Sequence, residues 1–239
     1  GKPIVLVVMA GRPITLANVS DQVAAILYAW HPGTMGGPAI ADLLFGNESP
    51  SGKLPVTFPR LVGQIPIYYA RKNTGRPPSQ EAITHIDAID GRAAQTYLGM
   101  SAFYLDAGCE PLFPFGYGLT YTEFEYSNIT LSTPEVRRGE TVTISVTLRN
   151  VGTRTGTEVV QLYVRDVVAS RVRPVRELRG FRRVELAPGA STEVRFELHT
   201  ADLAFHDPCM AHVVEPGEFH VWIGGDANAS LGSAFHLVP

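Results

Sequence analysis

The sequence predicts a chain of two structural classes, an α/β segment followed by an all-β sandwich. A continuous apolar run from Ile4 to Met9 is typical of a parallel strand that is covered on both faces. From position 142 onwards, apolar and polar residues alternate, which is typical of half-buried antiparallel strands. Between the two patterns, the stretch Pro114 to Tyr121 holds three aromatic rings and two glycines. We expect this stretch to be an interdomain linker whose rings are buried.

Composition narrows the class of protein. The chain has 239 residues, of which 45% are hydrophobic and 18% are charged, as in globular proteins. The net charge of −3 gives no attraction to nucleic acid or to an anionic membrane. No apolar run approaches the ~18 to 20 residues of a membrane-spanning helix. We therefore expect neither nucleic acid nor membrane as a partner.

The first 70 residues predict only part of an α/β layer. Ser20 or Asp21 is expected to start the element after the first strand, and the apolar stretch Val23 to Trp30 predicts a second strand. Thr34 is expected to cap a helix that Gly46 closes. A short strand is predicted at 54–58. These elements are too few to close a sheet covered on both faces, so we expect the rest of the layer to lie upstream.

Residues 71–110 predict a long polar loop without a sustained period. A loop of this length in a compact domain is usually either functional or disordered.

The remaining residues predict a sandwich of seven strands, because alternating runs are separated by recurrent turns. The clearest runs are at 142–148, 160–164, 194–198 and 219–223. The Arg-rich stretch 171–183 is interpreted as a solvated strand face. Phe219 occupies a place where such sandwiches often have a tyrosine, so we expect its packing role to survive without the hydroxyl hydrogen bond.

Few side chains in the α/β segment carry a specific chemical signal. Gly33 to Gly37 could present backbone amides to a phosphate, but the spacing matches neither G-x-G-x-x-G nor a P-loop. A tight turn between strand and helix is the favoured interpretation. Trp30 and His31 end a strand at the edge where α/β sheets place ligands. Packing against a neighbouring domain is the alternative for this pair.

Acidic, histidine and cysteine residues give no catalytic or metal pattern. A retaining glycosidase needs two carboxyls only ~5 to 5.5 Å apart, and the spacing of the loop acids does not predict this; they are Asp87, Asp90, Asp106 and Glu110. The histidines lack a ligand spacing, so we predict no metal site and no cofactor; they include His199, His206, His212, His220 and His236. Cys109 and Cys209 are expected to be free buried thiols, and a disulfide in an oxidising compartment is the alternative.

Several motifs then occur in one order along the chain. Together they resemble the C-terminal third of glycoside hydrolase family 3, and within it the periplasmic β-glucosidases of Gram-negative bacteria. The motifs are Gly1 to Pro3 with Gly11 to Pro13, Trp30 to Gly33 with Gly36 and Gly37, Ser49 to Pro59, Gly63 to Tyr69, Asn73 to Pro77, and Pro114 to Tyr121. Residues 80–100 match no family motif.

The resemblance implies a fold and a domain division. It implies the second half of an α/β sandwich domain at 1–70, a long loop and aromatic linker at 71–121, and a fibronectin type III-like domain at 122–239. An N-terminal (β/α)8 barrel is the implied partner, and a homodimer is a further candidate assembly.

The resemblance also implies retaining hydrolysis of terminal β-D-glucosyl residues from β-linked gluco-oligosaccharides. The nucleophilic Asp and the acid/base Glu of the family would both lie upstream of Gly1, so no catalytic residue is expected in this chain. Alone, the chain is expected to be inactive. Location in the periplasm or outside the cell is expected.

Substrate contacts are expected from few residues, and alternatives remain open. The candidates for substrate binding are Trp30, His31, Tyr68, Tyr69 and Arg71. The loop 71–110 is expected to line the outer part of a sugar site or a dimer contact. The alternatives are a β-xylosidase or β-N-acetylglucosaminidase of the same family, or a non-catalytic carbohydrate-binding or adhesion module. A free-standing module should not begin in the middle of a sheet, which argues against the last.

Overall fold

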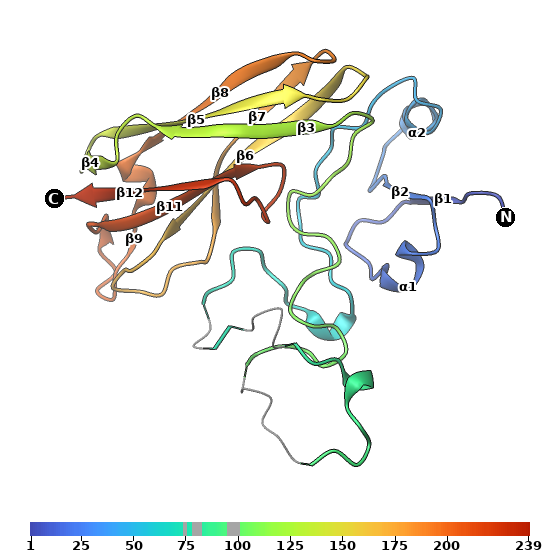
Figure 1. The fold of residues 1–239 in the computed structure, drawn as a ribbon, viewed down its shortest axis with the longest axis horizontal. Coiled ribbons are helices and arrows are strands. Elements are labelled where there is room, and N and C mark those ends of the chain that lie inside the picture. Colours follow the sequence, from blue (N-terminus) through green and yellow to red (C-terminus); the bar gives the residue numbers. More distant parts are fainter. Residues whose placement is uncertain (74–75, 78–82, 95–100) are drawn as a thin grey trace.

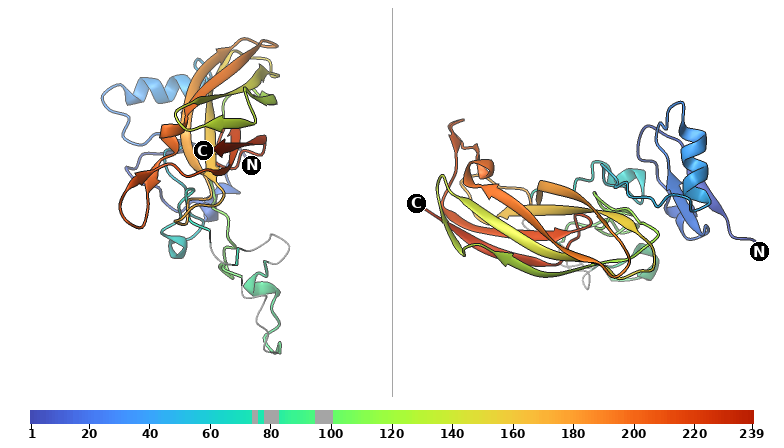
Figure 2. Two further views of the ribbon diagram at one scale, coloured as in Figure 1. Left: turned by 90° about the vertical axis from the view of Figure 1, so that its left-hand side faces the viewer. Right: turned by 90° about the horizontal axis from the view of Figure 1, so that it is seen from above.

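A computed structural model describes residues 1–73, 76–77, 83–94 and 101–239. A β-sandwich and a small α/β segment lie at opposite ends of the molecule, and the linker runs between them (Figure 1). Residues 83–94 extend away from both bodies (Figure 2). No helix in the described part of the chain is long and apolar enough to cross a bilayer.

The α/β segment contains the two predicted strands as a parallel pair. Strand β1 (Val5–Val8) pairs with β2 (Ala25–Tyr28), with Val5 opposite Ala25 and Val8 opposite Tyr28. A one-turn helix α1 (Ala17–Ser20) connects them, and α2 (Gly36–Leu44) follows. The two predicted strands and the helix before Gly46 are therefore confirmed.

Three details of this segment were predicted wrongly. Ser20 ends α1 rather than starting an element. Met35, not Thr34, is the N-cap of α2, and no side chain caps this helix. The strand predicted at 54–58 is reduced to one isolated bridge between Phe58 and Phe113. The bridge partner lies 55 positions further along the chain, so local pattern could not reveal that only one residue pairs.

Apolar surfaces that were expected to be covered are open. In β1, Val5 is 48% exposed, and Phe45 at the end of α2 is 83% exposed. Two strands and two helices have too little surface to cover both faces of a parallel pair. Further exposed apolar side chains in this segment are Ile4, Met9, Met35 and Leu44.

The sandwich consists of two packed sheets. One has the order β4-β12-β11-β6-β7 and the other the order β3-β5-β8. The bounds are β3 Phe124–Leu131, β4 Glu135–Arg137, β5 Thr141–Asn150, β6 Gly156–Asp166, β7 Glu177–Leu186, β8 Ser191–His199, β11 Gly217–Gly224 and β12 Gly232–Val238. Neighbours are antiparallel except β4 and β12. The described residues thus place eight strands in the two sheets rather than the predicted seven.

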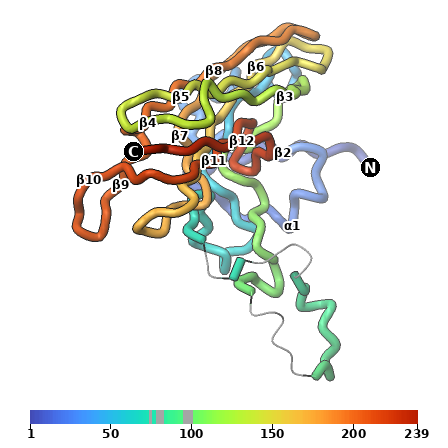
Figure 3. The backbone as a smooth tube through the Cα atoms, turned by 60° about the vertical axis from the view of Figure 1, so that its left-hand side comes forward, coloured from blue at the N-terminus to red at the C-terminus, as the bar shows by residue number. Residues whose placement is uncertain are grey.

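A separate hairpin of β9 (Phe205–His206) and β10 (His212–Val213) follows the 3₁₀ helix Thr200–Leu203. It lies at the end of the sandwich far from the N-terminus (Figure 3).

Alternating side chains of both sheets form the main core. On β5 every second residue is buried, as the period of two predicted. Phe219 is buried and stacks on Phe235 with ring centroids 5.4 Å apart, so its expected packing role is confirmed.

The linker is only partly buried. The rings of Phe115 and Tyr117 are half-buried, whereas Tyr121 is exposed, so the expectation of full burial is wrong for this residue. Tyr121 lies across the surface of the junction, where its hydroxyl donates a hydrogen bond to the Leu43 carbonyl at the end of α2 (2.6 Å). A polar anchor of this kind leaves one face of the ring in water.

Candidate functional site

An open groove of about 670 Å³ lies between the loop-and-linker region and the sandwich. We call it the linker groove. Its first wall is formed by residues of 57–77 and 109–115, and its second wall by β6, β11 and the approach to β7. The side chains that the argument uses are Tyr68, Tyr69, Arg71, Phe115, Arg176 and Trp222.

Tyr69 anchors the first wall to the sandwich. Its ring stacks on Phe115 at 4.2 Å between centroids and meets Tyr163 edge-on at 6.0 Å. Its hydroxyl accepts a hydrogen bond from the backbone amide of Leu178 (3.3 Å). Because both its face and its hydroxyl are engaged, Tyr69 is a packing residue at the base of the groove.

Tyr68 and Arg71 present side chains to the groove. Tyr68 is 66% exposed. The Arg71 carbonyl accepts a hydrogen bond from the Val175 amide (2.8 Å), which fixes the backbone while the exposed side chain lines the groove. These two side chains are therefore available to a ligand.

Arg176 organises the second wall. It donates hydrogen bonds to the carbonyls of Ala227 (2.6 Å) and Ala229 (2.7 Å), and its guanidinium lies 4.2 Å from the centre of the Trp222 ring. Burial lowers the pKa of Arg176. The guanidinium thus fixes the turn before β12 and one face of the indole ring.

The lining of the groove combines aromatic faces with amide and guanidinium donors and offers no pair of carboxyls among its described residues. Aromatic faces beside amide and guanidinium donors suit a sugar. A retaining glycosidase needs two adjacent carboxyls, but Glu110 is the sole carboxylate among the described lining residues. The described residues of the groove could therefore contact a sugar, but they do not supply the two carboxyls that retaining hydrolysis needs.

Two of the five candidate residues lie elsewhere. Trp30 has a positive φ of 52° and packs against Tyr28 (4.6 Å) and Phe58 (6.0 Å) in the α/β segment. His31 is exposed beside Gly11, where a Cβ atom would lie 2.2 Å from its Nε2 atom. The structure therefore brings together Tyr68, Tyr69 and Arg71, but not Trp30 and His31, and the roles of all five in substrate binding stay predictions.

Other sequence features have local structural roles. Gly33 adopts a positive φ of 71°, which fits the tight turn favoured over a phosphate loop. Asp90 accepts a hydrogen bond from the Arg92 amide (2.7 Å). Cys109 is half-buried, and Cys209 is exposed at the tip of the β9–β10 hairpin, so the expectation of a buried thiol is wrong for Cys209. Among the described residues no three His, Cys, Asp or Glu side chains cluster as metal ligands.

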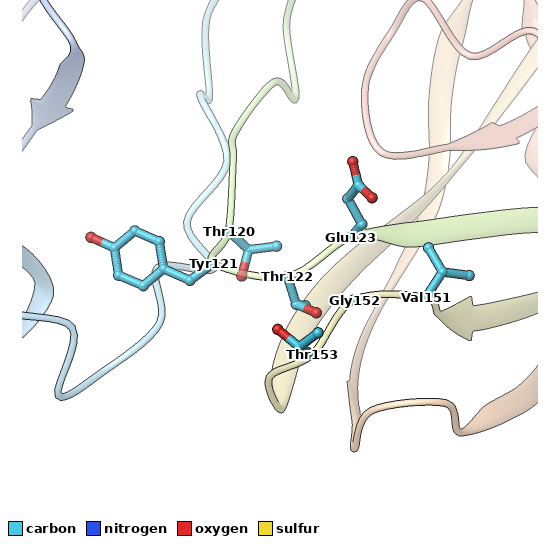
Figure 4. A pocket seen from close by; sticks show the side chains of 7 residues that line it. All are labelled: Thr120, Tyr121, Thr122, Glu123, Val151, Gly152 and Thr153. Atoms are coloured by element: carbon cyan, nitrogen blue, oxygen red, sulfur yellow. The ribbon is translucent and has the colours of Figure 1, made fainter.

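A second, shallower depression lies where the linker meets the β5–β6 turn (Figure 4). Three of its seven lining residues are threonines, and Thr122 donates a hydrogen bond to Asn150 (2.7 Å). Glu123 is its one ionisable side chain besides Tyr121. We assign this depression a structural role.

Local sequence patterns do not predict the contact between Arg176 and Trp222. They lie 46 positions apart and meet only because β7 and β11 both flank β6. The signals present in the sequence were separate: Arg176 directly precedes the strand β7, and Trp222 lies within the strand β11.

Comparison with known proteins assigns both parts of the chain. Residues 1–121 match the glycosyl hydrolase family 3 C-terminal domain, and residues 158–227 match the fibronectin type III-like domain. A periplasmic β-glucosidase of Salmonella typhimurium is 45% identical over 100% of this chain and 29% of its own length.

Other relatives extend this picture. A putative β-xylosidase of Formosa agariphila is 38% identical over 99% of this chain and 28% of its own length. The crystal structure of a β-glucosidase from Listeria innocua in complex with glucose superimposes with a TM-score of 0.89 at 37% identity, over 100% of this chain and 31% of that one. This chain thus spans less than a third of the length of each of these relatives, and it belongs to glycoside hydrolase family 3.

Proposed function

We propose that this chain is the C-terminal part of a retaining β-glucosidase that releases terminal β-linked glucose. The observation that carries the proposal is the match to the Salmonella β-glucosidase, which runs along the whole chain at 45% identity. The Listeria β-glucosidase supports it at the level of the fold. The Salmonella relative is a periplasmic β-glucosidase, which also supports a periplasmic or secreted location for the protein that contains this chain.

In this proposal the chain supplies the scaffold and a second portion supplies the catalytic carboxylates. The linker groove holds one described carboxylate, which is too few for retaining hydrolysis. The open apolar side chains around β1 and α2 form a surface suited to a further protein layer. We propose that a barrel-containing N-terminal portion packs there, and that the chain alone is inactive.

The scaffold role has a physical basis. A catalytic group displaced by about 1 Å can cost ~100-fold in rate. A rigid connection between the α/β segment and the sandwich would therefore affect catalysis even though no reacting group lies in the chain. Contacts across the linker, such as the Tyr69–Phe115 stack, contribute to this rigidity.

A β-xylosidase is the second candidate, because the Formosa relative is 38% identical over nearly the whole chain. Glucose and xylose differ by one hydroxymethyl group. The sugar pocket that would distinguish them is proposed to lie in the N-terminal portion.

A chimera tests the proposal. The part of the Salmonella β-glucosidase that this chain matches is replaced by the chain, and hydrolysis of p-nitrophenyl β-glucoside and β-xyloside is measured. The unmodified Salmonella enzyme and the same enzyme truncated before the replaced part serve as controls. We expect the chimera, but not the truncated enzyme, to hydrolyse the glucoside. A folded chimera as inactive as the truncated enzyme would contradict the proposed scaffold role.

A further inference from the structure

The β9–β10 hairpin brings two histidines into direct opposition. His206 on β9 is the pairing partner of His212 on β10, and both side chains are exposed. The Asp207 amide donates a hydrogen bond to the Ala211 carbonyl (3.0 Å), so Asp207 and Ala211, next to the two histidines, form a hydrogen-bonded pair. His206 and His212 therefore form a non-hydrogen-bonded pair, the arrangement in which opposite side chains of antiparallel strands lie closest.

The separation of the two rings suits a shared metal ion. Their centroids are 5.1 Å apart and their planes are inclined by 45°. A transition metal about 2.1 Å from a ring nitrogen lies roughly 3.2 Å from that ring's centroid. Two imidazoles on one ion, at angles from square-planar to tetrahedral, then have centroids roughly 4.5 to 5.2 Å apart. The observed separation lies within this interval.

The turn holds the pair in place. Asp207 Oδ1 accepts hydrogen bonds from the amides of Cys209 and Ala211, both at 2.8 Å, and the Met210 amide donates to the Asp207 carbonyl (3.0 Å). Phe205 on the opposite face is buried, and the Arg173 guanidinium lies 4.7 Å from its ring centre. The hairpin is thus fixed on one face and presents the two imidazoles on the other.

We propose that His206 and His212 form a two-histidine site for a divalent first-row transition metal such as Zn²⁺ or Cu²⁺, with water completing the coordination. Imidazole is a preferred ligand of both ions, and Cu²⁺ binds most tightly in this series. The two residues are six positions apart and are aligned by the strand register, so no ligand spacing in the sequence predicts this pair. The site lies at the end of the sandwich far from the α/β segment (Figure 3).

The test compares the 239-residue chain with matched histidine variants. Zn²⁺ binding is measured by isothermal titration calorimetry for the unmodified chain, His206→Ala, His212→Ala and His236→Ala. His236 is an exposed histidine on β12 with no histidine opposite, since its pairing partners are Glu218 and Glu135. We expect one equivalent of Zn²⁺, with affinity lowered more than about tenfold in each of the first two variants and unchanged in the third. Circular dichroism establishes that all variants remain folded.

A second measurement separates imidazole from thiolate ligation, because Cys209 lies in the same hairpin. In a Cys209→Ser background, Cu²⁺ bound to the chain is expected to show pulsed electron paramagnetic resonance signals of two imidazole nitrogens. Loss of Zn²⁺ binding in Cys209→Ser, with retention in His206→Ala, would overturn the proposal. So would equal losses in His236→Ala and His212→Ala, or no binding by the unmodified chain.

Discussion

The Nζ atom of Lys53 lies 2.8 Å from Oε1 of Glu158, and both side chains are largely buried. Lys53 lies after α2 within the α/β segment and Glu158 lies on β6, so the pair connects residues 105 positions apart. Lys53 also donates a hydrogen bond to the Gly118 carbonyl in the linker (2.9 Å). Burial and the charge of Glu158 raise the pKa of the neighbouring Tyr126 hydroxyl, which therefore stays neutral. The ion pair joins the segment, the linker and the sandwich at one point.

Removing one partner of this pair is expected to destabilise the fold strongly. In Glu158→Gln, Lys53 keeps its charge in a buried place without a counter-ion, which costs about 3 to 5 kcal/mol in comparable cases. Urea unfolding measures the free energy of unfolding. The control is Glu193→Gln, which removes the exposed Arg195–Glu193 pair and should change stability little. Equal effects of the two substitutions would contradict a special role for Lys53 and Glu158.

Gly116 is expected to tolerate no side chain. Its φ is 80°, and a Cβ atom there would lie 2.2 Å from Oε1 of Gln161. Gln161 is buried and donates hydrogen bonds to the carbonyls of Gly116 (3.1 Å) and Gly225. Gly116→Ala should therefore lower the free energy of unfolding by more than the ~1 kcal/mol that an unfavourable φ costs alone.

The matched control for this substitution is Gly139→Ala. Gly139 has a similar φ of 89° but open space where a Cβ atom would lie. Its loss of stability measures the conformational cost alone. Thermal or urea unfolding that gives the same loss for both variants would show that the contact with Gln161 is unimportant.

Asp166 is expected to make stability depend on pH. Burial raises the pKa of this carboxyl from 3.8 to about 6; Arg173 opposes the shift, and Glu215 and Glu177 add to it. The folded state therefore binds more protons than the unfolded state between these two values. It follows that Asp166 makes the fold less stable as pH rises from about 4 to about 6.

Asp166→Asn removes this ionisation while it keeps the shape of the side chain. At pH 7.5 the variant is expected to be more stable than the unmodified chain by about 1 kcal/mol or more. The gain should disappear near pH 4. Urea unfolding at a series of pH values measures both, and parallel stability curves for the two proteins would refute the assignment.

The linker groove is expected to contribute to binding of longer substrates. In the chimera with the Salmonella enzyme, Tyr68→Ala should raise KM for a gluco-oligosaccharide several-fold, because a sugar ring loses an aromatic face worth about 1 kcal/mol. Hydrolysis of the short p-nitrophenyl β-glucoside should change little. Tyr104→Ala is the control, since Tyr104 is an exposed tyrosine outside the groove. Unchanged oligosaccharide kinetics in Tyr68→Ala would remove the groove from the substrate path.

Local periodicity predicted the elements that bury one regular face. In strand β5, buried residues alternate with partly buried or exposed ones along its length, and the pattern of its sequence was therefore sufficient to predict it. Strand β7 is an edge strand with three arginines, Arg179, Arg182 and Arg183, and Phe181 is exposed among them, so its pattern indicated only a solvated face. The isolated Phe58–Phe113 bridge depends on a distant partner. Such pairings are not encoded in a short window of sequence.

The candidate site was predicted less completely than the fold. Tyr68 and Tyr69 end a family-like motif, Arg71 begins the predicted long loop, and all three line one groove. The opposite wall required Arg176 and Trp222, which tertiary structure alone brings together. His206 and His212 escaped for the same reason, since a strand register rather than a fixed spacing places them opposite each other.

The most direct test of the central claim is the hydrolysis of p-nitrophenyl β-glucoside by the purified, folded 239-residue chain on its own. The account predicts no release of nitrophenol above the uncatalysed rate. The described residues of the linker groove include one carboxylate, whereas retaining hydrolysis needs two. Release of nitrophenol by the chain alone would contradict the account if Glu110→Gln, or the removal of any other carboxylate of this chain, abolished that release.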